Sequence, residues 1–188
     1  MPVCAGFCKG VRQTMKKHLF LTGEKQVGKT TAIEKFLEMW PGEVAGFVTR
    51  SQVDQQGRRV YVCSPDGKRK MEAVHFTTPE HKEPCDPRAF EGLAVELLRQ
   101  SARPGCVTLM DELGFMESGI RPFTQAVLER LALPWPVLGV LRLEDNPFLR
   151  SVAEHPMVRV VMVTKENRDK LPRLLYQYYT TEDDWPEE

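Results

Sequence analysis

The sequence predicts an α/β fold, a three-layer sandwich in which helices cover both faces of a mostly parallel β-sheet. Short, nearly unbroken apolar runs alternate with amphipathic helical patterns, which is typical of parallel strands buried on both faces. A GxxxxGKT pattern between the first apolar run and the first helical pattern indicates a phosphate-binding loop, or P-loop. Three β-type runs between residues 44 and 76 add an antiparallel meander, as an insertion in the sheet or an extension of it.

Residues 15–180 are expected to form a single domain, because a chain of 188 residues is close to the usual domain size. Met15 precedes two lysines and an apolar run, which resembles a natural start, so residues 1–14 are interpreted as an N-terminal extension. Residues 181–188 are interpreted as an acidic tail that is solvated at its end.

Composition and charge favour a cytoplasmic protein. The 26 basic side chains balance the 26 acidic ones, so the net charge indicates no nucleic-acid partner, although it leaves room for a local basic patch. No apolar run approaches the roughly 20 residues that span a bilayer, and the first residues lack the apolar core of a secretory signal. Five scattered cysteines, an odd number, fit free thiols in a reducing compartment.

The first half of the chain begins with a strand, a loop and a helix. Residues 18–23 form an apolar run that ends in glycine, and residues 29–40 have helical periodicity until Pro41 and Gly42. The apolar face of this helix consists of Ile33, Phe36, Leu37 and Trp40. The meander then has β-type runs at residues 43–50, 58–64 and 70–76, separated by the turn-forming sequences "DQQG" and "SPDGK".

The second half returns to alternating helices and strands. Residues 88–101 read as a helix with apolar side chains at core spacing. Strands are predicted at residues 106–112, 135–143 and 158–164, and helices at 123–133, 146–154 and 166–179. Because amphipathic helices separate buried strands, each connection is expected to be a parallel crossover.

The P-loop is the strongest functional signal. Its glycines let the backbone curl around phosphate, so that amide groups and the helix N-terminus point at the anion. Lys29 is expected to bridge the β- and γ-phosphates, and the Thr30 hydroxyl is expected to ligate Mg²⁺. The nucleotide-binding residues predicted here are Gly23, Glu24, Lys25, Gln26, Val27, Gly28, Lys29, Thr30 and Thr31.

A second signal is the buried strand that ends in "MDELGFME". Asp111 fits a Walker B carboxylate, which holds Mg²⁺ at the carboxyl edge of the sheet beside the P-loop. Glu112 follows it and is well placed to orient and polarise an attacking water, unless it serves as a capping or surface residue. Glu117 either orients this loop or is ordinary surface charge.

A third signal, "VTKENRDKL", follows the last predicted strand, where ligands of open α/β sheets bind. Asn167 and Arg168 are therefore candidates for contacts with the nucleotide. Asn167 occupies the place of the aspartate in the guanine-reading motif of GTPases, and its amide does not offer guanine two acceptors, so guanine specificity does not follow. Arg168 contacts the phosphates or stacks on the base, or else caps the helix and pairs with Asp169.

Among the arginines, Arg50 is the first choice for a residue that stabilises charge on the γ-phosphate. It follows a predicted strand end, "GFVTR", whereas the basic residues in the turns of the meander are expected to be solvated. Whether such an arginine comes from this chain or a neighbouring subunit is left open.

Together, "LFLTGEKQVGKTT", "GFVTR" with a "GRR" turn, "MDELGFME" and "VTKENRD" resemble the small P-loop nucleoside-triphosphatase family, the cancer-related NTPases. The resemblance covers residues 16 to about 175 and implies a RecA-like fold and Mg²⁺-dependent hydrolysis of ATP, GTP and other nucleoside triphosphates, with loose base preference. It assigns phosphate binding to residues 23–31, Mg²⁺ to Asp111 and water activation to Glu112. Phe115 replaces a lysine that is frequent in the family, and the segment after the "GRR" turn also departs from its pattern.

The sequence therefore predicts a hydrolase of nucleoside triphosphates, with Lys29, Glu112 and Arg50 as catalytic residues and Thr30 and Asp111 as metal ligands. Two alternatives remain at this stage. One is a nucleotide or small-molecule kinase, in which the meander is the candidate acceptor lid. The other is a nucleotide-dependent switch that acts on a partner.

Overall fold

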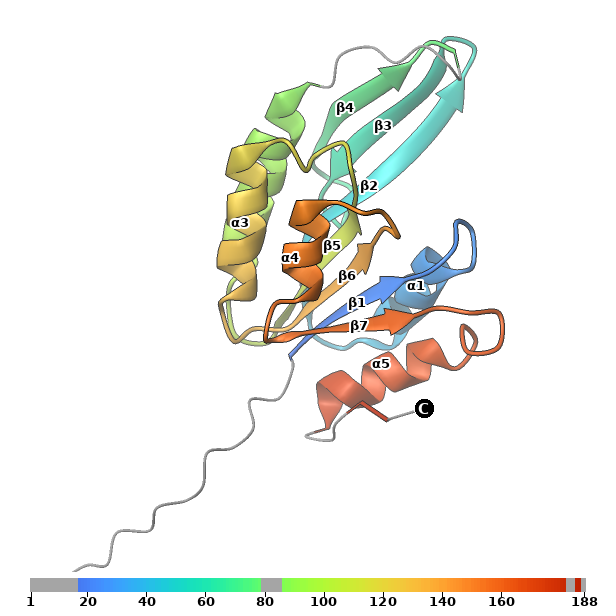
Figure 1. Cartoon of the computed structure of the whole chain (residues 1–188), viewed down its shortest axis with the longest axis vertical. Helices are drawn as coiled ribbons and strands as arrows, with labels where there is room; N and C mark the ends of the chain where they lie inside the picture. The colour runs from blue at the N-terminus through green and yellow to red at the C-terminus, as the bar shows by residue number, and fades with distance from the viewer. Residues whose placement is uncertain (1–16, 79–85, 182–184, 187–188) are drawn as a thin grey trace, which may run out of the picture.

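The computed structural model describes residues 17–78, 86–181 and 185–186. Their core is a seven-stranded sheet in the order β4-β3-β2-β5-β6-β1-β7, with helices on both faces (Figure 1). β1 pairs in parallel with β6 and β7, and β5 pairs in parallel with β6 and β2. The strands of the parallel part are β1 (His18–Thr22), β5 (Cys106–Leu113), β6 (Val137–Leu141) and β7 (Val158–Met162). The predicted α/β sandwich and its parallel crossovers are confirmed.

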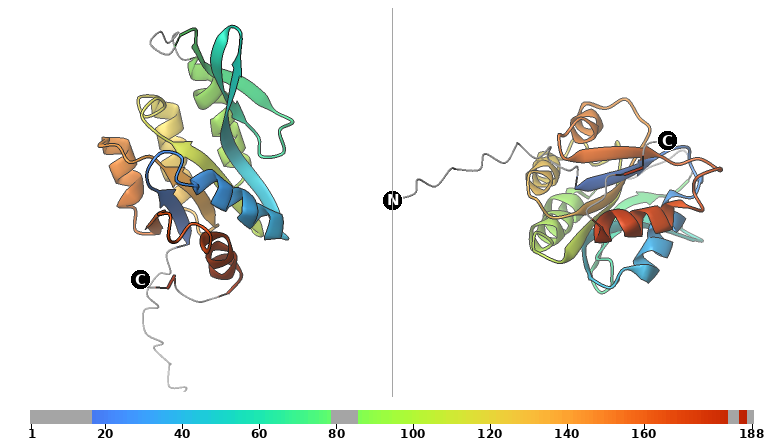
Figure 2. Two further views of the ribbon diagram at one scale, coloured as in Figure 1. Left: turned by 90° about the vertical axis from the view of Figure 1, so that its right-hand side faces the viewer. Right: turned by 90° about the horizontal axis from the view of Figure 1, so that it is seen from below.

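The helices divide into two layers (Figure 2). One face of the sheet is covered by α1 (Lys29–Met39) and α5 (Leu171–Thr180). The other face is covered by η1 (Ala89–Ala94), α2 (Val95–Gln100), α3 (Arg121–Leu131) and α4 (Pro147–Ala153). The helix predicted at residues 88–101 is present, but its first part, η1, has π-helical hydrogen bonding.

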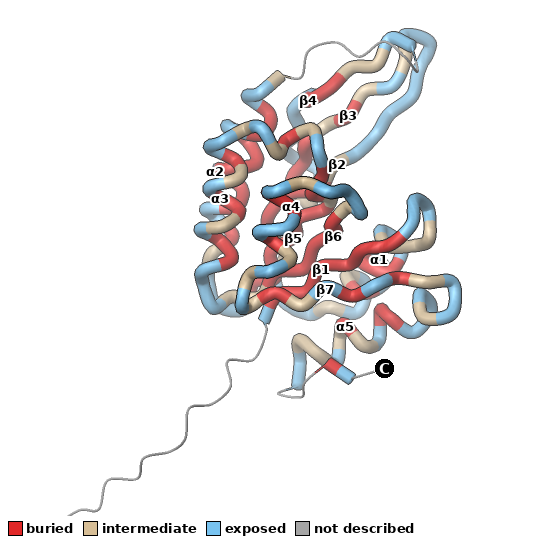
Figure 3. Tube along the Cα trace, viewed as in Figure 1, coloured by how far each residue is buried: buried red, intermediate tan, exposed pale blue. Residues whose placement is uncertain are grey.

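The strands at the centre of the sheet are buried on both faces, as Figure 3 shows for β1, β5 and β6. Successive side chains of a strand point to opposite faces, so each strand supplies both cores. In β1, Phe20 packs into the core under α3 and α4, whereas Leu19 and Leu21 pack under α1 and α5. This two-sided burial explains why these strands lack the alternation of a half-exposed sheet.

The meander is an extension of the main sheet rather than a separate insertion. It consists of β2 (Glu43–Asp54), β3 (Gly57–Cys63) and β4 (Lys70–Phe76). The first half of β2 pairs in parallel with β5, and its second half pairs antiparallel with β3. β2 therefore continues past the predicted end at residue 50, because the hairpin partner satisfies the backbone of a segment whose side chains are exposed and mostly polar.

A cluster of polar side chains is buried at the amino ends of the parallel strands. The Arg130 side chain of α3 is 2% exposed and donates to Thr108 Oγ1 at 2.7 Å and to the carbonyl oxygen of Trp135 at 3.1 Å. His18 is fully buried, and its Nε2 lies 2.9 Å from the carbonyl oxygen of Leu131.

The predicted N-terminal extension, residues 1–14, lies outside the described residues. Of the predicted solvated tail, Trp185 is described and is buried, with its ring 5.8 Å from that of Tyr178 in the core under α5. Within the described ranges, no helix has the length and apolar character required to cross a membrane.

Candidate functional site

The P-loop joins β1 to α1 and has the backbone that its glycines permit. Gly23 and Gly28 have φ values of 141° and 117°, and Gln26 is left-handed at 64°. A Cβ atom at Gly23 would lie 2.7 Å from the carbonyl oxygen of Val163, so no larger residue fits there without a shift of the backbone just after β7. The loop therefore turns tightly enough to present its amides and the start of α1 to one point.

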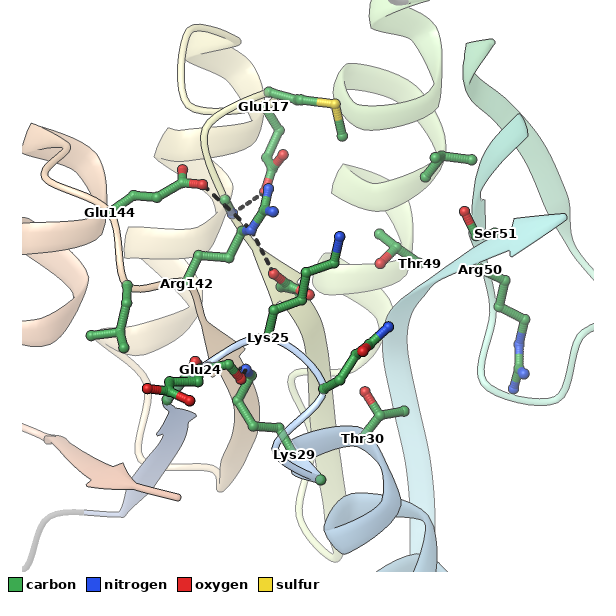
Figure 4. A pocket seen from close by; sticks show the side chains of 18 of the residues that line it. Glu24, Lys25, Lys29, Thr30, Thr49, Arg50, Ser51, Glu117, Arg142 and Glu144 are labelled. Atoms are coloured by element: carbon green, nitrogen blue, oxygen red, sulfur yellow. Dashed lines mark hydrogen bonds and ion pairs between the residues drawn. The ribbon is translucent and has the colours of Figure 1, made fainter. Parts of the chain in front are cut away.

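Lys29 lies at the start of α1 and folds back over the loop. Its Nζ donates to the carbonyl oxygens of Gly23 and Glu24, each at 2.8 Å. The ammonium group is thus fixed above the loop, where a lysine bridges the outer phosphates of a bound triphosphate. Lys25 and Thr30 face the same space (Figure 4).

A cleft of about 890 Å³ lies above the P-loop. The loop forms one side, β2 and β3 form a second, and the ends of β5 and β6 form a third (Figure 4). From the predicted site it contains Gly23, Glu24, Lys25, Gln26, Gly28, Lys29, Thr30, Thr31, Arg50 and Glu112. Val27, which was also predicted to bind nucleotide, packs against the core under α1 and α5 instead of lining the cleft.

Asp111 and Glu112 lie near the end of β5, and the peptide bond between them is cis. Asp111 is buried, and its pKa is raised to about 7, chiefly by this burial. The nearby charges of Glu112 and Glu34 contribute to the rise, and those of Arg50 and Lys29 oppose it. Asp111 therefore lies within electrostatic reach of the P-loop lysine, as a Walker B carboxylate must.

Glu112 differs from Asp111 because its side chain is 38% exposed and lines the cleft. Its Oε1 lies 2.9 Å from Nε of Arg142. Five residues after Glu112, Glu117 is 3% exposed and accepts a hydrogen bond from the backbone N–H of Gly114. Of the two readings of Glu117, the structure favours the one in which it orients this loop.

Asn167 and Arg168 lie in the loop between β7 and α5, next to the P-loop but outside the lining of the cleft. The Asn167 amide is used within its own loop, since it donates to the carbonyl oxygen of Met162 at 2.8 Å and accepts from the N–H of Thr164 at 2.9 Å. Arg168 donates to the carbonyl oxygen of Val27 at 3.4 Å and packs against Gly28. Arg168 therefore supports the P-loop from outside the cleft, whereas Asn167 stabilises its own loop.

Arg50 lines the cleft from β2 and is exposed. In Figure 4 its guanidinium lies apart from the group formed by Lys25, Lys29 and Thr30. The structure brings it to the cleft without a direct contact to the P-loop.

Several residues that line the cleft were not predicted from the sequence, above all Arg142 and Glu144, and also Thr49 and Ser51. Arg142 comes directly after β6 and was included in the predicted strand at residues 135–143. One signal in the sequence could have identified Arg142 as a lining residue. It follows a buried apolar run, and ligands bind at such strand ends in open α/β sheets.

The oxygen donors at this site fit Mg²⁺. Mg²⁺ favours a few protein oxygens together with phosphates and water, and Thr30 and Asp111 provide a hydroxyl and a carboxylate at the P-loop. In the described ranges no group of three or more histidine, cysteine, aspartate or glutamate side chains forms a metal site. A site that relies on one hydroxyl, one carboxylate and the substrate itself would form no such group.

Comparison with known proteins agrees with this geometry. A sequence model of the family described as NTPase matches residues 18–176. The human cancer-related nucleoside-triphosphatase is 37% identical over 178 residues, which cover 84% of this chain and 93% of the human protein. The nucleoside-triphosphatase THEP1 of Aquifex aeolicus is 26% identical over 164 residues, with 80% and 92% covered.

Solved structures show the same fold. The crystal structure of THEP1 from Aquifex aeolicus matches with a TM-score of 0.72 at 25% identity, over 87% of this chain and 99% of that one. The solution structure of a human cancer-related nucleoside triphosphatase matches with a TM-score of 0.68 at 30% identity, over 89% and 100%. With a P-loop, a Walker B strand and a family match along nearly the whole described domain, this chain belongs to the small P-loop nucleoside-triphosphatase family.

Proposed function

We propose that this protein hydrolyses nucleoside triphosphates to diphosphate and phosphate in the cytoplasm, depends on Mg²⁺ and accepts several bases. The observation that carries the proposal is the meeting of Glu112 and the P-loop in one cleft, with Asp111 buried beside them. A phosphate-binding loop without further groups would only bind a nucleotide. A carboxylate on the opposite wall adds a group that can orient water toward the γ-phosphorus.

In this proposal each residue has one role. The P-loop amides and Lys29 hold the β- and γ-phosphates, and Thr30 and Asp111 would hold Mg²⁺, which would neutralise charge that develops on the phosphate oxygens. Glu112 orients the attacking water and accepts its proton, and Arg50 contributes positive charge from β2. Hydrolysis then breaks the bond between the γ-phosphorus and the bridging oxygen.

Broad base specificity is supported by the loop after β7. Asn167 and Arg168 border the nucleotide at the base side in this proposal, but their polar groups already bind the loop backbone. The Asn167 amide is thereby committed to Met162 and Thr164, so it is unsuited to reading the edge of one base.

A phosphate-release assay across ATP, GTP, CTP, UTP and the deoxynucleotides, with Mg²⁺ and with EDTA, tests the proposal. We expect Mg²⁺-dependent release from several of these substrates and a loss of release in EDTA. Failure to release phosphate from any triphosphate would refute it, and release from GTP alone would refute the broad base preference.

One observation keeps the kinase alternative open. The cleft continues past the P-loop to apolar side chains of β3, η1 and the loop after β5, namely Val60, Phe90 and Met116. This arm provides room for an acceptor molecule beyond the γ-phosphate. Transfer of γ-labelled phosphate to added nucleosides or nucleoside monophosphates, instead of to water, would favour the kinase.

A further inference from the structure

Arg142 holds a defined position beside Glu112. It is the first residue after β6, and its backbone N–H donates to the carbonyl oxygen of Leu113 at 3.0 Å, which ties it to the end of the neighbouring β5. Two adjacent strand ends thus carry a carboxylate and a guanidinium at the same edge of the sheet. Sheet pairing, rather than a flexible surface loop, sets the distance between them.

The Arg142 side chain reaches Glu112 over the backbone of Gly114. A Cβ atom at Gly114 would lie 2.7 Å from Cδ of Arg142, so the glycine leaves the path free. The Nε atom lies 2.9 Å from Oε1 of Glu112 and 3.5 Å from Oε1 of Glu144. Figure 4 shows Arg142 and Glu144 side by side on the same wall of the cleft, with their charged ends turned toward each other.

The closest contacts of Arg142 to both carboxylates are made by Nε, and within the parts of the chain that the structure describes no hydrogen bond is found at its two terminal nitrogens. The side chain is 40% exposed and lines the cleft. A guanidinium carries five N–H donors in a planar fork, and phosphate oxygens match two of them at once. The free end of the fork is therefore available to an anion in the cleft.

The charges on this wall of the cleft also favour contact between Arg142 and an anion. From β5, β6 and the loops after them, three carboxylates line the cleft, those of Glu112, Glu117 and Glu144. Among the described lining residues of this wall, Arg142 is the one cation. A triphosphate carries several negative charges, so without Arg142 this wall would repel the terminal phosphate.

We propose that Arg142 is the arginine of this chain that stabilises charge on the terminal phosphate, and that its pairing with Glu112 positions the water-orienting carboxylate. This inference rests on the proposed hydrolase function. It places the arginine on the β5–β6 wall, opposite the β2 wall from which Arg50 was expected to act. One side chain then links the carboxylate and the phosphate, so that both are aligned together.

Steady-state phosphate release by Arg142→Ala, Arg142→Lys and Arg50→Ala tests this assignment. We expect Arg142→Ala to lower kcat by a factor of about 100 or more, the loss usual for one charge-stabilising donor, while KM changes by less than about fivefold. Arg142→Lys should also lose at least about tenfold in kcat, because an ammonium group lacks the fork that contacts carboxylate and phosphate together. Arg50→Ala should lose less than Arg142→Ala.

Two further readouts separate this role from a purely structural one. Guanidinium ion at low, non-denaturing concentration should partly restore kcat to Arg142→Ala, and affinity for a non-hydrolysable ATP analogue should stay near that of the wild type. The matched control is Arg99→Ala, an exposed arginine of α2 outside the lining of the cleft, which should retain wild-type kcat and should not respond to guanidinium.

The outcomes distinguish this inference from the function on which it rests. An inactive wild-type protein refutes the hydrolase function itself. An active wild type with an unimpaired Arg142→Ala, or a greater loss in Arg50→Ala, overturns only the assignment of Arg142. Should Arg142→Ala fail to fold, Arg142→Lys decides, since wild-type kcat in that variant also overturns the assignment.

Discussion

Neighbouring carboxylates at the end of β5 have different environments. Asp111 is 7% exposed, and burial is the largest cause of its raised pKa of about 7. Glu112 faces the cleft with a 38% exposed side chain and pairs with Arg142. A buried carboxylate suits a fixed metal ligand, because a cation beside it favours its ionised form, whereas a carboxylate in the cleft can reach water.

Two substitutions separate binding from hydrolysis at this scale. Lys29→Ala should weaken triphosphate binding and lower turnover together, because in the proposed mechanism the ammonium would contact the phosphates in both the bound and the reacting state. Glu112→Gln should keep binding within about threefold while kcat falls by about 100-fold or more, because the amide cannot accept a proton from water. Titration with a fluorescent triphosphate and phosphate release measure the two effects.

Unchanged triphosphate binding in Lys29→Ala, or lost binding in Glu112→Gln, would contradict these roles. Normal turnover by Glu112→Gln in particular would show that another group orients the water.

At the scale of elements, β2 connects two walls of the cleft, because it pairs with both the parallel part of the sheet and the antiparallel meander. Its first half pairs with β5, which carries the two carboxylates, and its second half starts the meander that supplies the opposite wall. Gly46 lies in the parallel half with a φ of 91°, and the backbone of Leu109 approaches it closely. A Cβ atom there would lie 2.2 Å from the carbonyl oxygen of Leu109.

Gly46→Ala should therefore lower the free energy of unfolding by about 3 kcal/mol or more, through backbone strain and the clash with β5 together. Gly105→Ala is the matched control, because Gly105 also has a positive φ, 74°, but its Cβ would meet no atom within 4 Å. This control should cost only about 1 kcal/mol. Urea denaturation of both variants gives the comparison, and equal losses would contradict a role for the close approach.

At the scale of the whole molecule, the two ends of the parallel strands have different functions. The carboxyl ends meet the P-loop and form the cleft, whereas the amino ends contain the polar cluster around His18 and Arg130. His18 has a pKa lowered to about 4, first by burial and further by the charges of Arg130 and His155, while the hydrogen bond to Leu131 opposes this shift. His18, whose protonation changes the stability of the fold, therefore lies at the end of the sheet away from the cleft.

His18 should make the protein less stable in mild acid. Its pKa is about 4 in the folded chain and about 6.5 when unfolded, so between these values the unfolded state binds more protons. The resulting stability is present above pH 6.5 and is lost as the pH falls toward 4, for a total of about 3 kcal/mol. Asp111 acts in the opposite direction over this range, because burial raises its pKa to about 7.

Substitution of His18 or Asp111 separates their two contributions to the pH dependence of stability. When stability is measured by denaturation from pH 4.5 to 7, its slope against pH should be more negative in His18→Gln than in the wild type. The slope should be more positive in Asp111→Asn, from which the opposing carboxylate is absent. An unchanged slope in His18→Gln would show that the histidine is not the group that titrates.

The sequence by itself determined the local features of this protein. Apolar runs flanked by helical patterns predicted the parallel strands, and the glycines with Lys29 and Thr30 predicted the P-loop, because these patterns depend on residues close together along the chain. Asp111 and Glu112 were found for the same reason, at the end of one apolar strand. The family resemblance rested on these pieces and is confirmed.

Only the tertiary structure decided which distant side chains share the cleft. Arg142 lies 30 residues after Glu112, but the pairing of β5 with β6 places the two in contact. Asn167 and Arg168 looked like ligand contacts in the sequence, and the loop after β7 turns their polar groups onto its own backbone and the P-loop. Strand order and register set these contacts, and both arise from packing across the whole sheet, which no local pattern of residues encodes.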